Sequence, residues 1–223
     1  ILTENFLTFA PAEFDDDKKN DKKKSKKELE MQLMMGSNAK SSKEEGKDNG
    51  DKIQKRCSTL LALSSIGSTP GLPLATADTI NLMTFLIDYG LCDPNETVRA
   101  ASASAGQKII ATYGAPSLDD LLPLFEKVLS TGASLNSSQK INNTVAAQDH
   151  RKEGAVVLLG SGALHLHNEN DSDKISATVD MLLGALKTPS ESVQRSVADC
   201  LVPLCKKGDT GSRAGSIVDG LMK

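Results

Sequence analysis

Residues 92–101 decide how this chain folds; they read Cys92-Asp93-Pro94-Asn95-Glu96-Thr97-Val98-Arg99-Ala100-Ala101. An apolar helical pattern runs up to Leu91, and small residues in helical spacing follow Glu96. Asp93 precedes a proline and is therefore biased away from helical backbone, which ends the first helix. Pro94 has a preset φ and no N–H, so it suits the start of a second helix. The stretch predicts two helices joined by a tight turn.

The same pattern recurs further along the chain. When Val193-Gln194 is aligned with Val98-Arg99, residues 186–193 fall under residues 91–98, and Leu, Pro, Glu and Val coincide. Arg151-Lys152 can occupy the equivalent place between them, which gives spacings of 53 residues (99 to 152) and 42 residues (152 to 194). A period of roughly 40–47 residues with two helices per unit is typical of HEAT repeats.

One face of the second helix of each unit is repeated three times. The positions four, seven and eleven residues after Arg99, Lys152 and Gln194 hold small or apolar residues: Ala103, Val156 and Ala198; Gly106, Leu159 and Leu201; Ile110, Ala163 and Cys205. A single helix pair cannot bury such a stripe, so neighbouring pairs stack into an array. We therefore predict an all-α fold, an α-solenoid of about three to four HEAT-type helix pairs. The alternative is an ordinary helical bundle.

The turns of this array carry residues that we expect to be architectural rather than catalytic. They end one helix, start the next and fix how the pairs stack, and Arg99 is placed to brace neighbouring turns. The structural residues of the repeat turns are Asp93, Pro94, Val98, Arg99, Pro189 and Val193.

Composition divides the chain into two regions. Residues 1–50 read as a charged low-complexity segment or linker that we expect to be largely disordered, because dense charge cannot bury apolar surface. Residues 51–223 read as the HEAT-repeat array, with a long polar loop over residues 131–148 and an incomplete last repeat. The predicted helices cover residues 52–68, 77–91, 96–113, 117–129, 155–166, 176–186, 191–205 and 214–222. The chain begins with Ile rather than Met, so we expect a piece of a longer protein.

Bulk composition narrows the class of protein. Apolar residues make up 39% of the chain but aromatic residues only 3%, which suits thin helical layers better than a sheet enzyme with an aromatic pocket. A net charge of −3 gives no general case for nucleic-acid binding. The sequence shows neither a signal peptide nor the roughly 18 apolar residues of a membrane span. We therefore expect a cytoplasmic protein that binds no membrane.

Few residues suggest chemistry. His165, His167, Glu169 and Asp171 form the only metal-like cluster, but side chains two residues apart on a helix point to different sides. The chain contains no phosphate-binding loop and no nucleophile elbow, and Ser161 lies between two glycines that favour close helix packing. We predict no catalytic, cofactor-binding or metal-binding residue, no small-molecule substrate, and no enzyme activity.

Lysine-rich sequence near the start of the chain offers one binding candidate. Such a cluster could contact ribosomal RNA or another polyanion, although neighbouring aspartates offset much of its charge. The lysines concerned are Lys22, Lys23, Lys24, Lys26 and Lys27.

Three segments resemble a known family. Residues 121–126 (LLPLFE), 153–160 (EGAVVLLG) and 186–198 (LKTPSESVQRSVA) are similar to segments of the large HEAT-repeat translational activator of the general amino-acid control pathway, the general control non-derepressible protein family. The resemblance covers residues from about 85 to 223, and residues 1–50 show no counterpart. Arg151-Lys152 departs from the Val-Arg that is usual in the family.

This resemblance implies a non-enzymatic scaffold on the ribosome. The parent protein would help to activate the kinase that phosphorylates initiation factor 2α when amino acids run short, and it would contact that kinase through other parts. Two further hypotheses for a HEAT array are an importin-β-like transport receptor and a phosphatase scaffold subunit.

Overall fold

The structure is a computed structural model that describes residues 41–72, 74–132, 135, 144–166, 171–206, 215, 217–220 and 222. In these residues the secondary structure is helical and contains no strand, which confirms the all-α prediction. The chain divides into two compact units, Ile1–Thr59 and Leu60–Lys223. The repeat turns all lie within Leu60–Lys223.

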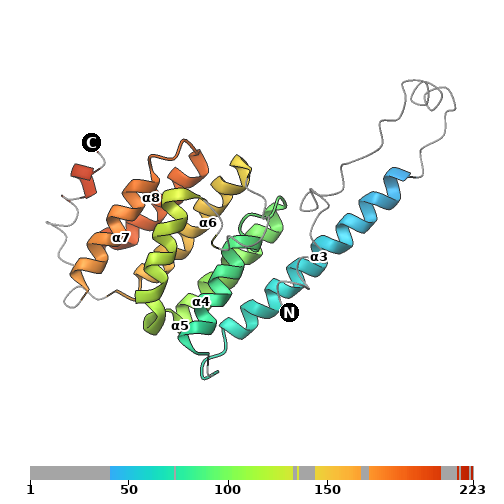
Figure 1. Cartoon of the computed structure of the whole chain (residues 1–223), viewed down its shortest axis with the longest axis horizontal. Coiled ribbons are helices and arrows are strands. Elements are labelled where there is room, and N and C mark those ends of the chain that lie inside the picture. The colour runs from blue at the N-terminus through green and yellow to red at the C-terminus, as the bar shows by residue number, and fades with distance from the viewer. Residues whose placement is uncertain are drawn as a thin grey trace. The chain divides into compact units, whose positions relative to one another are not determined.

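The helices follow the predicted order. They are α3 (Ser41–Gly67), α4 (Thr76–Phe85), the π-helix η3 (Leu86–Gly90), α5 (Glu96–Thr131), α6 (Val145–Ala163), α7 (Ser172–Ala185) and α8 (Glu191–Lys206). Within Leu60–Lys223, helices α4 to α8 are stacked side by side in nearly chain order, from green to orange (Figure 1). Beyond α8, residues 215 and 217–220 are also helical.

Helix α3 begins at Ser41, about ten residues before the predicted start near residue 51. Lys43, Glu44, Glu45 and Lys47 are good helix formers, and extending an existing helix is far easier than starting one. Gly46 and Gly50 concealed this signal in the sequence.

A π-turn ends the first helix of the first pair. The predicted helix over residues 77–91 is α4 followed by η3, in which the N–H of Leu91 donates to the Leu86 carbonyl over 2.8 Å. All five residues of η3 are buried. Such widened turns often mark functional positions, and this one brings Asp88 into the protein interior.

Helix α5 reverses its direction within its own length. A straight helix of 36 residues would be about 54 Å long. Nevertheless, two residues that flank α5 are in direct contact. Leu135 follows the end of α5 and Asp88 precedes its start, and the Leu135 N–H donates to Asp88 Oδ1 over 2.8 Å. The connecting residues span at most about 42 Å even when fully extended. The helix must therefore bend back, and its residues 96–113 and 117–131 form two arms.

The bend lies where the sequence predicted a break, at residues 114–116. A Cβ added to Gly162 of α6 would lie 3.2 Å from Leu118 and 4.0 Å from Ile110, so α6 meets both arms beside the bend. Ser117 does not cap a new helix as its neighbour Asp120 suggested; its hydroxyl donates to the Tyr113 carbonyl. The predicted helix end is a sharp bend in a continuous helix.

Helix α6 starts ten residues earlier than predicted. The helix over residues 155–166 is observed as Val145–Ala163, so the end of the expected loop is helical. Thr144 caps it, with its hydroxyl accepting from the N–H of Ala147 over 3.2 Å. The signal overlooked in the sequence was this cap, followed by two alanines that favour a helix.

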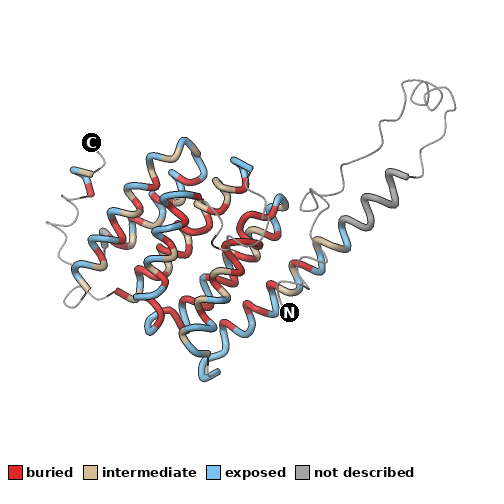
Figure 2. Tube along the Cα trace, viewed as in Figure 1, coloured by how far each residue is buried: buried red, intermediate tan, exposed pale blue. Residues whose placement is uncertain are grey.

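Glycines permit close contact between the helices of neighbouring pairs. A Cβ at Gly106 would come within 2.6 Å of Leu158, and one at Gly154 within 2.5 Å of Leu91. A Cβ at Gly160 would collide with Cys200 of α8, which confirms that the glycines around Ser161 serve packing. Buried residues accordingly follow the faces where helices meet, and exposed residues face outward (Figure 2).

The repeat alignment can be read in the burial of its positions. Val98, Arg151 and Val193, the first residues of the three aligned pairs, are all fully buried. The position seven residues after each pair is buried in all three units. The position four residues after is less uniform, since Val156 is buried and Ala198 is exposed.

Candidate functional site: the repeat turns and the adjoining groove

The first repeat turn is held by side chains that bond its own backbone. Asp93 is fully buried, and its Oδ1 accepts from the N–H of Asn95 over 2.8 Å. Asn95 is the N-cap of α5, with Oδ1 accepting from Thr97 N–H and Val98 N–H. Pro94 therefore precedes the cap instead of starting the helix, and it remains exposed. The turn satisfies the N–H groups that a helix start leaves open.

Arg99 reaches back over the same turn. Its Nη1 donates to the Asp93 and Pro94 carbonyls, each over 2.9 Å. These bonds brace its own turn, whereas the sequence had suggested a brace between turns. A bond from a charged donor is stronger than a neutral one.

The last repeat turn uses a neutral side chain in the same way. Gln194, aligned with Arg99, donates from Nε2 to the Leu186 and Thr188 carbonyls, each over 3.2 Å. Pro189 is exposed and Val193 is fully buried, as are their counterparts in the first turn. Two turns separated by almost a hundred residues thus share one bonding scheme.

The middle unit replaces this scheme with a buried cation. Arg151, aligned with Val98, is fully buried and donates from Nη1 to the Gly132 carbonyl over 2.7 Å. Gly132 ends α5 with a φ of 65°, a left-handed conformation that favours glycine. Arg151 therefore ties the end of α5 to α6, the element that follows the long connection.

Two buried acidic groups lie near the same thiol as this cation. Asp88 and Asp93 are fully buried, and both lie near the Cys92 thiol together with the Arg151 guanidinium. Burial raises the pKa of Cys92 to about 11, partly opposed by Arg151, so the thiol stays protonated. It donates to the Asp88 carbonyl over 2.7 Å. A protonated, enclosed thiol is a poor nucleophile, so this cluster suits structural locking.

Two sequence candidates are not placed by the structure. The lysines at 22, 23, 24, 26 and 27 lie outside the described residues, as do His167 and Glu169 of the His/acidic cluster, so polyanion contact remains a prediction. Among the residues that are described, no group of three or more His, Cys, Asp or Glu could hold a metal ion. The same part of the chain contains no helix long and apolar enough to cross a membrane.

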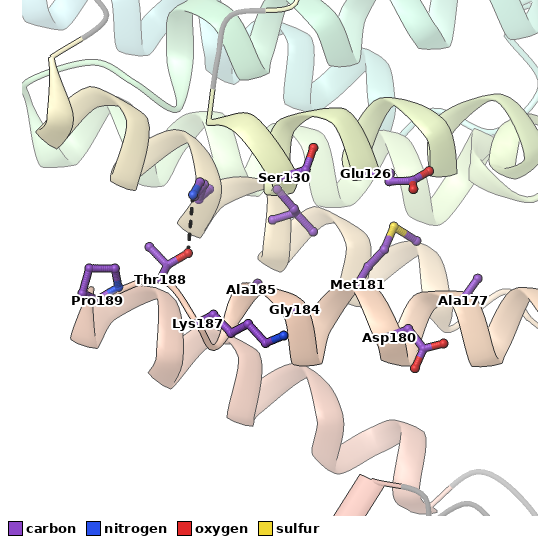
Figure 3. Close-up of a pocket in the computed structure, with 12 residues that line it drawn as sticks. Glu126, Ser130, Ala177, Asp180, Met181, Gly184, Ala185, Lys187, Thr188 and Pro189 are labelled. Atoms are coloured by element: carbon purple, nitrogen blue, oxygen red, sulfur yellow. Dashed lines mark hydrogen bonds between the residues drawn. The ribbon is translucent and has the colours of Figure 1, made fainter. Parts of the chain in front are cut away.

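A groove of about 660 Å³ lies beside the last repeat turn (Figure 3). Its walls are the second arm of α5 and helix α7, and the turn after α7 closes one end. Leu129 and Ala185 are buried in it, while Glu126 and Asp180 are exposed on opposite walls. No sequence pattern could indicate this groove, because its lining comes from three helices and a turn.

Two polar contacts join the elements that surround the groove. The Lys174 ammonium of α7 pairs with Asp119 Oδ1 of α5 over 2.5 Å. At the turn, Lys152 Nζ of α6 donates to Thr188 Oγ1 over 3.5 Å. The residues that line the groove are polar and apolar in similar measure, and they form no arrangement of a nucleophile and a base.

Fold and site together define a class: an α-helical repeat scaffold, in which similar turns position a continuous packed array. The comparisons with known proteins specify it further. A family profile described as "Stalled ribosome sensor GCN1, HEAT repeats" matches residues 24–164. The chain therefore belongs to this family and is a HEAT-repeat segment of a GCN1-type regulator.

Curated relatives agree with the profile. "Protein ILITYHIA" of Arabidopsis thaliana is 38% identical over 152 residues, which is 67% of this chain and 5% of that protein. "Stalled ribosome sensor GCN1" of Homo sapiens is 30% identical over 175 residues, 78% of this chain and 6% of that protein. "eIF-2-alpha kinase activator GCN1" of Saccharomyces cerevisiae is 30% identical over 146 residues, 64% of this chain and 5% of that protein. No solved structure matches the chain.

These matches confirm the resemblance and correct its extent. The profile starts at residue 24, so the statement that residues 1–50 show no counterpart is wrong in part. It ends at residue 164, before the segment 186–198 on which the resemblance partly depended. Membership of the family favours the translational regulator over the transport receptor and the phosphatase scaffold. The chain spans only 5–6% of these relatives' length.

Proposed function

We propose that this chain is a non-enzymatic scaffold segment of a cytoplasmic, ribosome-associated protein that promotes activation of the initiation factor 2α kinase during amino-acid starvation. The single observation that supports this most is the family match, because relatives over the same repeats are named a stalled ribosome sensor and an eIF-2-alpha kinase activator. The packing agrees with such a role, since side chains here serve turns and interfaces.

Within the parent protein the segment sets the spacing and direction of neighbouring repeats. Buried residues at equivalent positions, Val98, Arg151 and Val193, fix how each helix pair meets the next. In a stacked array each repeat contacts only its neighbours, so the packing of one repeat sets the position of the next. The kinase contacts other parts of the parent protein, and the segment contributes by holding the ribosome-binding surfaces in register.

Sedimentation of the parent protein tests this proposal. At low salt it should co-sediment with ribosomes, and an in-frame deletion of residues 76–206 should reduce both co-sedimentation and starvation-induced phosphorylation of initiation factor 2α. If the intact parent protein stays entirely in the ribosome-free fractions at low salt, the proposal is wrong.

A groove variant distinguishes spacing from direct contact. Gly184 is exposed on the groove wall, and a Cβ added there meets nothing within 4 Å, so Gly184→Leu places an apolar side chain at the groove from a position that has open space. If the segment is a spacer, this variant should sediment with ribosomes like the unaltered parent, whereas the deletion should not. If the Gly184→Leu variant no longer co-sediments with ribosomes, the groove itself contacts the ribosome.

A further inference from the structure

Thr188 stands out among the residues that line the groove. Its side chain is directed toward α6, where its hydroxyl accepts a hydrogen bond from Lys152 Nζ over 3.5 Å (Figure 3). Lys152 belongs to the middle unit and Thr188 to the last, so this contact joins two units of the array. At this length it is a weak bond, and a stronger acceptor on Thr188 would tighten it.

The repeat alignment shows what the last turn lacks. Thr188 is aligned with Asp93, and each directly precedes the turn proline. In the first turn the buried Asp93 carboxylate lies in a cluster that contains Arg151, a cation from the next unit. In the last turn a neutral hydroxyl faces Lys152, a cation from the preceding unit. A phosphate on Thr188 would place an acidic group at the position that Asp93 occupies in the first turn.

The surroundings of Thr188 can accept a phosphate. The groove has a volume of about 660 Å³ and opens beside the hydroxyl, and Lys187 is exposed next to it. Helix α8 begins three residues later at Glu191, so its positive end also faces this turn. Glu126 and Asp180 line the groove as well, but Lys152 is the group already in contact with the hydroxyl.

We propose that Thr188 is a phosphorylation site for a proline-directed protein kinase, and that Lys152 binds the resulting phosphate. Thr188 Oγ1 attacks the γ-phosphorus of ATP, the bond from that phosphorus to ADP breaks, and the hydroxyl proton passes to the base of the kinase. Pro189 follows the acceptor directly and is exposed, as this kinase class requires. The new charge forms an ion pair across the two units and stiffens their interface.

The chain contains an internal control, Thr69-Pro70. This second Thr-Pro pair is exposed, but the Thr69 hydroxyl donates to the Ser65 carbonyl over 2.9 Å, in place of an ammonium contact. A phosphate at Thr69 should therefore bring no Lys152-dependent stabilisation. The Thr69→Val variant removes this site and leaves Thr188 intact.

The experiment treats the full chain, carrying Thr69→Val, with ATP and a purified proline-directed kinase. Tandem mass spectrometry should locate one phosphate at Thr188, and both Thr188→Val and Pro189→Ala should abolish it. An unmodified Thr188 overturns the proposal, and so does phosphate incorporation that persists in Thr188→Val.

A second measurement tests the role of Lys152. Phosphorylation should raise the thermal unfolding midpoint of the chain, and Lys152→Gln should cancel that rise without preventing phosphorylation. Two results would overturn the proposed phosphate contact: an unchanged or lowered midpoint after phosphorylation, or an equal rise in the Lys152→Gln variant.

Discussion

The first and middle units of this array solve one problem in two ways. In the first, the buried position at the start of the second helix holds Val98, and a short turn closed by Asn95 and Arg99 precedes it. In the middle unit the same position holds Arg151, and its guanidinium bonds the end of α5 across a long connection. A short turn specifies its own geometry, whereas a long one needs a clamp from elsewhere. The difference teaches that the first residue of each aligned pair is buried in both units, whereas the type of side chain there depends on the length of the connection before it.

Replacing Arg151, which bonds the end of α5, should cause the largest loss of stability. Arg151→Val supplies the residue that the other two units carry, yet it leaves Asp88 and Asp93 buried without their cation. Breaking a buried charge cluster in this way costs about 3–5 kcal/mol. Urea denaturation should show this loss. Arg195→Ala, which breaks the exposed pair with Glu191, is the control and should change stability by less than about 0.5 kcal/mol.

Substitutions of glycine distinguish a tight helix interface from an open one. We expect their effect on stability to be smaller than that of Arg151→Val. Gly106→Ala forces a methyl group against the buried Leu158, because its Cβ would lie 2.6 Å away. Overpacking of this kind typically costs about 1–3 kcal/mol. Gly184→Ala fills open space beside the groove and should stabilise the chain by up to about 1 kcal/mol through helix propensity. Equal destabilisation by both variants in thermal unfolding would contradict the assigned packing.

Loss of the first turn's cap should rank third. Asn95→Ala removes the acceptor for the Thr97 and Val98 N–H groups and should cost about 1 kcal/mol. Asn95→Asp keeps an acceptor and should retain most of the stability. Chemical denaturation of both variants measures the difference, and a neutral Asn95→Ala would mean that the turn does not depend on this cap.

A pH effect between the same two units should be the smallest. Burial, and next the nearby Arg99 charge, lower the pKa of His150 below its ordinary value of 6.5. A lowered pKa means that the unfolded chain takes up the proton first, so stability falls as the pH drops through about 6.5 and levels off below the folded pKa. His150→Gln should remove this part of the pH dependence of the unfolding midpoint. A His150→Gln profile identical to the unaltered one would contradict the assignment.

The sequence was informative where one unit repeats another. Periodicity and turn chemistry predicted the helix order, a change in the chain near Gly114 (expected as a helix end, observed as a bend in α5) and the shared turn positions, because these depend on neighbours along the chain. It was less informative where distant segments meet. The pattern places Arg151 at the repeat position and marks it as a departure from Val-Arg, but its role depends on Asp88, Cys92 and Gly132, which are distant in sequence. The groove was not foreseeable for the same reason, and the early starts of α3 and α6 were hidden by glycines and by an overlooked cap.

Native-state hydrogen exchange of the Arg151→Val variant tests most directly whether this chain is a stacked array. In an array each unit depends on its neighbours only, so protection should fall at the amides around residues 88–93 and 132–151. The amides of α7 and α8 should keep most of their protection. If all helices lose protection together and by the same amount, the chain is a single cooperative bundle, and the account of stacked repeat units is wrong.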